Sequence, residues 1–257
     1  MSAPHFETLR ISVDGAVGEM QLARPDRLNA LSHTLLSEMV EACHWWASQS
    51  AVRVIVLSGE GRSFSAGFDL GDLRAANSSM SPRDNADLGR RMADAVTDVP
   101  QLTIAAVHGH CVGGGVVMVA ACDMRIAHPD TTFIIPEVDL GMPLTWGGIP
   151  RLVREIGPAL TKELVLTCRP FGADEAKAIR FINQISHDPK QEALDWAGSL
   201  ANKPLYALQT TKQQVNAVTE EMISTARNAA DADQLLIAMR DPESKQASVQ
   251  YLAKRKK

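Results

Sequence analysis

Apolar and polar residues recur along the first part of the chain in patterns that predict a hairpin followed by a helix. Two short strands are expected at 9–13 and 16–23, and they flank Asp14-Gly15, a dipeptide that favours a tight hairpin turn. Ser32 is a preferred helix N-cap. The apolar residues that follow it recur at the helical period, so we expect a helix to begin there.

Two continuous apolar runs predict strands that are buried on both faces. They lie at 52–59 and 102–109, and each is followed by a loop that contains glycine. Strand, turn and helix patterns that repeat in this way favour parallel sheets with crossover helices, so we expect an α/β fold. Further helices are predicted at 84–98 and 113–122, and further short strands at 122–128 and 131–136.

The pattern changes near residue 187, beyond which helical periods follow one another with no strand between them. We therefore expect two regions, a core over 1–187 and a helical region over 188–257. Apolar faces of the later helices, which include Met222 and Leu236, need a surface to cover them. The four helices of this region are predicted at 189–202, 204–216, 219–239 and 242–253.

Composition narrows the class of protein and of partner. The chain has 257 residues and a formal net charge of −4 with no long basic stripe, so nucleic acid is not an expected partner. No apolar run approaches the roughly 18 residues of a membrane span, and the N-terminus lacks the cationic and apolar regions of a signal peptide. The four cysteines have neither metal-ligand nor disulfide spacing, which predicts reduced thiols, no metal site and a cytoplasmic location.

Two loops with glycine, 65–70 (SAGFDL) and 111–117 (CVGGGVV), follow the buried strands. Ligands gather at such loops in open α/β sheets, and Gly67 and the glycines at 113–115 permit positive φ and a close approach of the backbone. Free N–H groups from two such loops could converge on an oxyanion, although either loop alone is better explained as a tight turn. Neither loop has the spacing of a nucleotide-phosphate motif.

Taken together and in this order, the segments resemble the enoyl-CoA hydratase/isomerase (crotonase) family. The resemblance begins at 23–31 (ARPDRLNAL), continues through both glycine loops and 133–152, and ends in helices that finish YLAKRKK. It implies a crotonase-like spiral of ββα units with a C-terminal helical region that mediates trimerisation. It also implies an acyl-CoA substrate, with coenzyme A as part of that substrate and no separate cofactor, and a homotrimer or homohexamer.

The resemblance also assigns site residues. The N–H groups of Ala66 and Gly114 match the family's two oxyanion donors, and Glu137 matches one of the two glutamates that many hydratases carry. The second glutamate would occupy Val117, so that carboxylate is absent. The residues expected to contact the CoA thioester are Arg24, Leu28, Ser65, Ala66, Phe68, Asp69, Gly113 and Gly114.

The valine at 117 favours isomerisation over hydration. Hydration requires a water to be deprotonated while the α-carbon is protonated, and two acids usually share this work. The shift of a 3-enoyl-CoA to a 2-enoyl-CoA needs a single base, and the apolar neighbours of Glu137 should bury it and raise its pKa. A hydratase that works with one glutamate and a non-catalytic acyl-CoA-binding protein are the alternatives. Dienoyl-CoA isomerisation is disfavoured, since that activity's additional acids would fall at Val117 and Thr145.

Three neighbouring residues have two interpretations each. Asp69 is expected to cap the helix after its loop rather than to react. Trp146 either narrows the acyl pocket or packs in the core. Arg24 either contacts the CoA phosphates or belongs to a solvated charge cluster.

Overall fold

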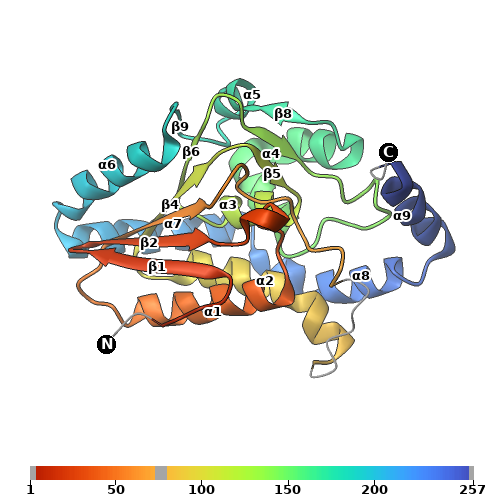
Figure 1. Cartoon of the computed structure of the whole chain (residues 1–257), viewed down its shortest axis with the longest axis horizontal. Coiled ribbons are helices and arrows are strands. Elements are labelled where there is room, and N and C mark those ends of the chain that lie inside the picture. The colour runs from red at the N-terminus through yellow and green to blue at the C-terminus, as the bar shows by residue number, and fades with distance from the viewer. Residues whose placement is uncertain (1–3, 73–79, 255–257) are drawn as a thin grey trace.

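The computed structural model describes residues 4–72 and 80–254, except for the side chains of residues 227 and 229. Its strands are β1 (Leu9–Asp14), β2 (Val17–Leu22), β3 (Val54–Gly59), β4 (Leu102–Val107), β5 (His110–Val112), β6 (Met124–Ala127), β7 (Thr132–Ile134), β8 (Phe171–Gly172) and β9 (Gln184–Ile185). They form a six-stranded sheet in the order β1-β2-β3-β4-β6-β9 and a three-stranded sheet in the order β5-β7-β8 (Figure 1).

Helices surround the two sheets (Figure 1). The α-helices are α1 (His33–Ala47), α2 (Pro82–Asp98), α3 (Gly114–Ala120), α4 (Gly148–Thr167), α5 (Ala173–Ala178), α6 (Pro189–Ala201), α7 (Leu205–Met222), α8 (Asp231–Ala238) and α9 (Pro242–Lys254). The short 3-10 helices in the described ranges are η1 (Pro25–Arg27) and η2 (Thr225–Ala230).

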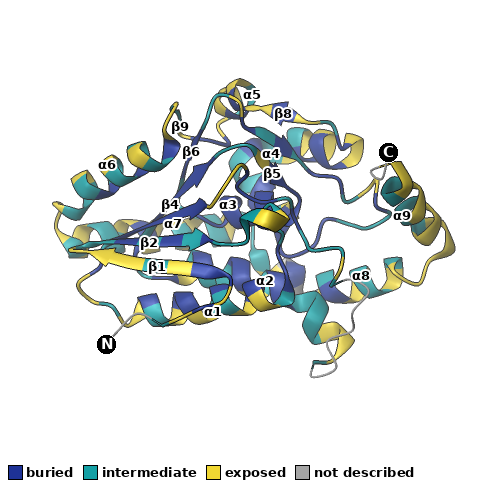
Figure 2. Cartoon of the chain, viewed as in Figure 1, coloured by how far each residue is buried: buried dark blue, intermediate teal, exposed yellow. Residues whose placement is uncertain are grey.

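The structure confirms the predicted hairpin and parallel sheet. β1 pairs with β2 in antiparallel fashion across the Asp14-Gly15 turn, where Gly15 has a φ of 57°. From β2 onward the larger sheet is parallel, through the pairs β2–β3, β3–β4, β4–β6 and β6–β9. Every residue of β3 is buried, as its continuous apolar run predicts (Figure 2).

Both faces of the larger sheet are covered. The main core joins the sheet to α1, α2 and α3, whereas α6 covers the opposite face through Ala193 and Ala197. These two alanines pack in one cluster with Val54, Val56 and Ile104 of the sheet. The boundary predicted near residue 187 stays a prediction. α6 lies beyond that boundary and packs on the same sheet as the core region.

Side chains set the ends of two helices. Ser32 caps α1 as predicted, because its Oγ accepts a hydrogen bond from the N–H of Leu35 at 3.2 Å. The single helix predicted over 219–239 is wrong. α7 ends at Met222, Ile223 has extended φ and ψ of −145° and 88°, and Ser224 caps the next turn by accepting from the N–H of Ala226 at 3.1 Å. Serine side chains compete with the backbone in this way, and the break lets α8 pack against α2.

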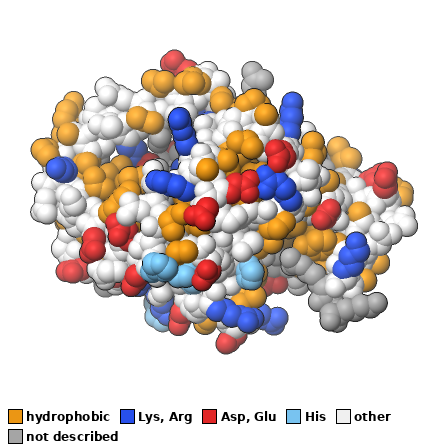
Figure 3. Space-filling model, turned by 90° about the horizontal axis from the view of Figure 1, so that it is seen from above, with side chains coloured by type: hydrophobic (Ala, Val, Ile, Leu, Met, Phe, Trp, Pro, Cys, Tyr) orange, Lys and Arg blue, Asp and Glu red, His pale blue; other side chains and the backbone are white. Residues whose placement is uncertain are grey.

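The surface shows no field of one charge on the face seen in Figure 3, where Lys and Arg side chains lie among Asp, Glu and apolar side chains. All four cysteines are buried and free. No helix in the described ranges is long and apolar enough to cross a membrane. Likewise, residues 4–72 and 80–254 hold no cluster of three or more His, Cys, Asp or Glu side chains placed to bind a metal ion.

Candidate active site

A cavity of about 250 Å³ lies between the loop that opens α3, the start of α2, the segment 137–146 and α8. Its lining is largely apolar and includes Phe68, Val117, Trp146, Leu235 and Leu236. Leu236 is therefore a partly buried residue that faces this cavity. Glu137 and Asp72 are the carboxylates that line the cavity within the described residues.

Glu137 has its carboxyl group buried in this apolar lining. Its Oε2 is buried and has no hydrogen-bond partner among the described residues. Burial raises the pKa of Glu137, and a backbone hydrogen bond offsets only part of this increase, so the pKa is about 7. A β-carbon on Gly113 would lie 2.5 Å from Glu137 Oε1, so the carboxyl group rests against the α-carbon of Gly113, next to Gly114.

The glycine loop directs one backbone N–H into the cavity. Gly113 adopts a φ of 50°, a region that favours glycine, and its own N–H donates to the Ile134 carbonyl at 2.8 Å. Gly114 is the first residue of α3, so its N–H has no acceptor within the helix. Gly114 lines the cavity beside Glu137, where a negatively charged oxygen would accept this N–H.

Ala66, the predicted second donor, is not supported by the structure. Its N–H donates to the carbonyl of Leu28 at 2.9 Å, and Ala66 is not part of the cavity lining. An N–H that is already bonded to a buried carbonyl cannot serve a ligand without giving up that bond.

Phe68 supplies the N–H that Ala66 does not. The segment forms a parallel bridge with Leu31, in which Gly67 accepts from the Leu31 N–H at 2.8 Å and Asp69 donates to the Leu31 carbonyl at 3.0 Å. Successive N–H groups of an extended chain point to opposite sides, so the Phe68 N–H points away from Leu31. No hydrogen bond among the described residues uses this N–H, and Phe68 lines the cavity together with Gly114 and Glu137.

Four of the predicted contact residues join the segment 24–29 to the first glycine loop instead of lining the cavity. Arg24 Nη2 pairs with Asp69 Oδ2 at 2.9 Å, and Ser65 Oγ donates to the Asn29 carbonyl at 2.9 Å. Leu28 accepts the Ala66 N–H described above. The cap predicted for Asp69 is wrong, because Asp69 Oδ1 accepts from Gly71 N–H at 3.1 Å and Ser81 caps α2.

The sequence analysis missed Asn29, which joins the segment around Arg24 to the residues before the first glycine loop. Asn29 is fully buried with a φ of 52°, a backbone region that asparagine tolerates better than most residues. Its Nδ2 donates to the carbonyls of Glu60 and Ser63 at 2.8 and 2.9 Å, and its Oδ1 accepts the Arg24 N–H at 2.9 Å. An asparagine in a loop next to glycine-bearing segments is the signal that could have identified it.

Two further polar side chains of the cavity were also missed. His33 and Asp72 both line it, and the His33 N–H donates to Asp72 Oδ2 at 2.7 Å. The His33 ring lies edge-on to Phe68, with ring centroids 5.5 Å apart. No local pattern marks this pair, because His33 is in the first turn of α1 and Asp72 follows the first glycine loop.

Known proteins share extensive sequence similarity with this chain. A family model described as enoyl-CoA hydratase/isomerase matches residues 12–257. The chain is 35% identical over 224 residues to a mitochondrial Delta(3,5)-Delta(2,4)-dienoyl-CoA isomerase of Homo sapiens, covering 80% of this chain and 68% of the relative. It is 31% identical over 255 residues to a crotonyl-CoA hydratase of Syntrophomonas wolfei, covering 98% and 97% of the two chains.

A solved structure shows the same fold. An enoyl-CoA hydratase/isomerase from Mycobacterium paratuberculosis superposes with a TM-score of 0.88 at 25% identity, and the match covers 95% of this chain and 98% of that chain.

Proposed function

This chain is an enzyme of the enoyl-CoA hydratase/isomerase family, and we propose that it catalyses the isomerisation of 3-enoyl-CoA to 2-enoyl-CoA. One observation carries the proposal. The cavity holds a buried carboxyl group, that of Glu137, beside the Gly114 N–H, while the neighbouring position 117 is an apolar valine with 1% exposure.

The proposed reaction moves one proton and one double bond. The N–H groups of Phe68 and Gly114 donate to the thioester oxygen, and the Glu137 carboxylate removes a proton from C2. The electron pair of the broken C–H bond forms a dienolate whose negative charge is on that oxygen. Glu137 then returns the proton to C4, the C2–C3 double bond forms, and the carbonyl is restored.

The environment of Glu137 suits this role. A base whose pKa is about 7 is substantially ionised near neutral pH, yet it remains strong enough to take a proton from C2. Water activation is disfavoured because Val117 offers no group to orient a water on that side. A hydratase that works through Glu137 alone is the alternative, and the similarity to a crotonyl-CoA hydratase supports keeping it in the test.

A second candidate is the isomerisation of 3,5-dienoyl-CoA to 2,4-dienoyl-CoA. We disfavoured it because positions 117 and 145 lack acids, and those positions are Val117 and Thr145 in the cavity lining. Asp72, hydrogen-bonded to His33, places another carboxyl group in the same cavity. In this reaction a proton leaves C2 and a proton arrives at C6, so a second acid at a distance from Glu137 would serve it.

Coenzyme A enters this proposal only as part of the substrate, with no separate cofactor and no metal ion. Arg24 is paired with Asp69, so fewer of its N–H groups remain for CoA phosphates. We propose a cytoplasmic homotrimer or homohexamer. The oligomer is supported by the exposed apolar side chains of α7, where Val215, Val218 and Met222 are 59%, 57% and 73% exposed.

The test is a substrate panel. Purified protein is incubated with 3-enoyl-, 2-enoyl- and 3,5-dienoyl-CoA, and products are separated by chromatography and identified by mass and absorbance. We expect 2-enoyl-CoA to form fastest from 3-enoyl-CoA, and Glu137→Gln to abolish this reaction. Asp139→Asn, which changes an exposed carboxylate two residues away, is the control and should retain full activity. Faster formation of 3-hydroxyacyl-CoA from 2-enoyl-CoA would make the enzyme a hydratase.

A further inference from the structure

Trp146 is held in a slot at the reacting end of the cavity. A β-carbon on Gly89 of α2 would overlap Cδ2 and Cε2 of the indole, and a β-carbon on Gly114 would overlap Cζ3. The indole therefore packs directly on the α-carbons of two glycines. Phe68 closes a third side, with ring centroids 5.7 Å apart and an interplanar angle of 88°.

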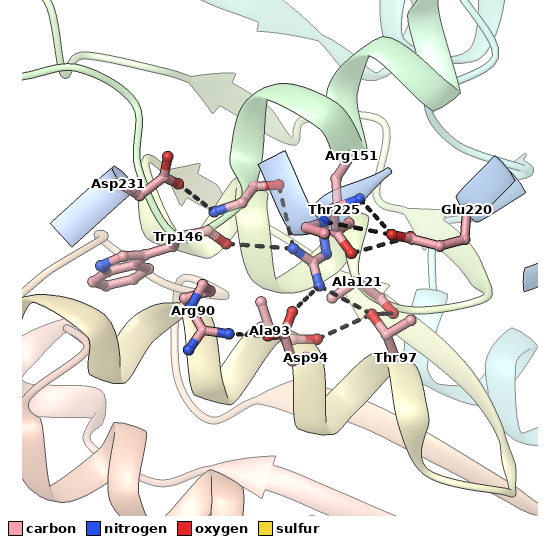
Figure 4. A network of polar contacts seen from close by, with 12 residues as sticks. Arg90, Ala93, Asp94, Thr97, Ala121, Trp146, Arg151, Glu220, Thr225 and Asp231 are labelled. Carbon is pink, nitrogen blue, oxygen red and sulfur yellow. Dashed lines mark hydrogen bonds and ion pairs between the residues drawn. The ribbon is translucent and has the colours of Figure 1, made fainter. Parts of the chain in front are cut away.

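The backbone of Trp146 is fixed in an unfavourable conformation. Its φ is 61°, a left-handed region that bulky side chains rarely adopt. Such a conformation persists only where the surrounding contacts hold it. Here Arg151 Nη1 donates to the carbonyls of Trp146 and Gly147, at 3.4 and 3.2 Å, and the Gly147 N–H donates to Asp231 Oδ2 at 2.9 Å (Figure 4).

Arg151 is anchored in turn by α2. Its side chain is 3% exposed and its Nη2 pairs with Asp94 Oδ1 at 2.8 Å, while Asp94 also pairs with Arg90 (Figure 4). The turn at Trp146 is thus bonded to α2, α4 and α8 at once. The indole is in place before any ligand enters and has little room to move.

We propose that Trp146 is a specificity-determining residue, whose indole restricts the substrate to acyl groups that are unbranched at C2 and C3, the two carbons that follow the thioester carbonyl. The proposal rests on the function proposed above, because the Gly114 N–H locates the carbonyl. With the carbonyl oxygen at Gly114, the carbons that follow it lie beside the indole that packs on the same glycine.

A methyl branch on those carbons would have to displace the ring. The indole cannot move toward α2, because it already packs on Gly89, and Phe68 flanks the ring. The extra methyl group would therefore clash with the indole. Overpacking of this kind costs about tenfold or more in affinity.

Binding of saturated acyl-CoA thioesters tests this role of Trp146 without turnover. Isothermal titration calorimetry is run with butanoyl-CoA, 2-methylpropanoyl-CoA and 3-methylbutanoyl-CoA on wild type and on Trp146→Leu. We expect wild type to bind at least one of the two branched thioesters about tenfold or more weakly than the linear one. Trp146→Leu should bring all three within about threefold. Trp146→Phe, which keeps a flat ring, should retain part of the discrimination and guards against loss of folding in the leucine variant.

A glycine pair provides a matched control. Gly89→Ala must push the indole out of its slot, so butanoyl-CoA should bind more weakly by about tenfold. Gly198→Ala makes the same change within α6, where nothing lies within 4 Å of the added carbon, and should leave affinity unchanged.

The outcomes separate this proposal from the proposed reaction. If wild type binds linear thioesters more tightly than branched ones and Trp146→Leu does not, the proposed role of Trp146 is supported, even if the substrate panel shows no isomerisation. Equal affinity for linear and branched thioesters in wild type overturns it, as does an unchanged ratio in folded Trp146→Leu. Failure to bind any acyl-CoA overturns both proposals.

Discussion

Replacing Glu137 by glutamine should stabilise the folded protein at neutral pH while it abolishes the proposed isomerisation. The carboxyl group is buried, its Oε2 has no partner among the described residues, and burial raises its pKa from 4.5 to about 7. The folded protein therefore keeps this proton up to about pH 7, whereas the unfolded chain releases it near pH 4.5. Between these values the wild-type protein loses stability as the pH rises, and above pH 7 the loss is complete.

The pKa shift sets the size of the effect. Each pKa unit corresponds to about 1.4 kcal/mol, so the shift amounts to roughly 3 kcal/mol at pH 8. Glutamine is neutral at every pH and has nearly the same shape, so Glu137→Gln should recover most of this amount at pH 8 and almost none at pH 4.5. General acid–base groups contribute about 10²–10⁴ in rate, so turnover should fall at least that far.

Urea unfolding of wild type and variant at several values between pH 4.5 and 8.5, followed by circular dichroism, measures the difference. Asp139→Asn is the control, and its stability should follow wild type across the range because Asp139 is exposed. If the difference in unfolding free energy between Glu137→Gln and wild type does not grow with pH, the buried-carboxyl interpretation is refuted. Full activity in Glu137→Gln would refute its role as proton shuttle.

Three further predictions concern position 117, the Trp146 turn and assembly. Val117→Glu should raise 3-hydroxyacyl-CoA formation relative to isomerisation, measured by product chromatography, and should destabilise the protein by at least about 2 kcal/mol at pH 8 because a carboxylate enters an apolar lining. Arg151→Met should cost about 2 kcal/mol in urea unfolding, since it removes a buried guanidinium that pairs with the partly exposed Asp94, whereas Arg91→Met on the exposed side of α2 should cost less than about 1 kcal/mol. Sedimentation at micromolar concentration should give three or six times the 27.8 kDa chain mass, and a stable monomer would refute the assembly prediction.

Local patterns were sufficient for much of the fold. The hairpin at Asp14-Gly15, the cap at Ser32 and the buried strand β3 each depend on residues close together in sequence, and the structure confirms all three. The burial of Glu137 is also confirmed, but apolar residues that line the cavity with it, such as Phe68 and Val117, are distant in sequence.

Helices with internal breaks were harder to predict from the sequence. The sequence pattern predicted no element at α4, which contains Gly157 with a φ of 77° followed by Pro158. Conversely, one helix was predicted over 219–239, where the chain breaks at Ile223 and Ser224. In both cases packing decides whether a breaking residue ends a helix or only bends it, and packing partners are distant in sequence.

The candidate site divides along the same line. The sequence alone determined that two glycine loops, one glutamate and no acid at 117 are present, and it led to the correct family. Only the tertiary structure decided that Phe68, rather than Ala66, has an N–H that no described residue accepts, and that α8 and Trp146 enclose the cavity. The reason is physical: every residue except proline carries an N–H, and whether that N–H can serve a ligand depends on whether a carbonyl from a distant segment has already accepted it.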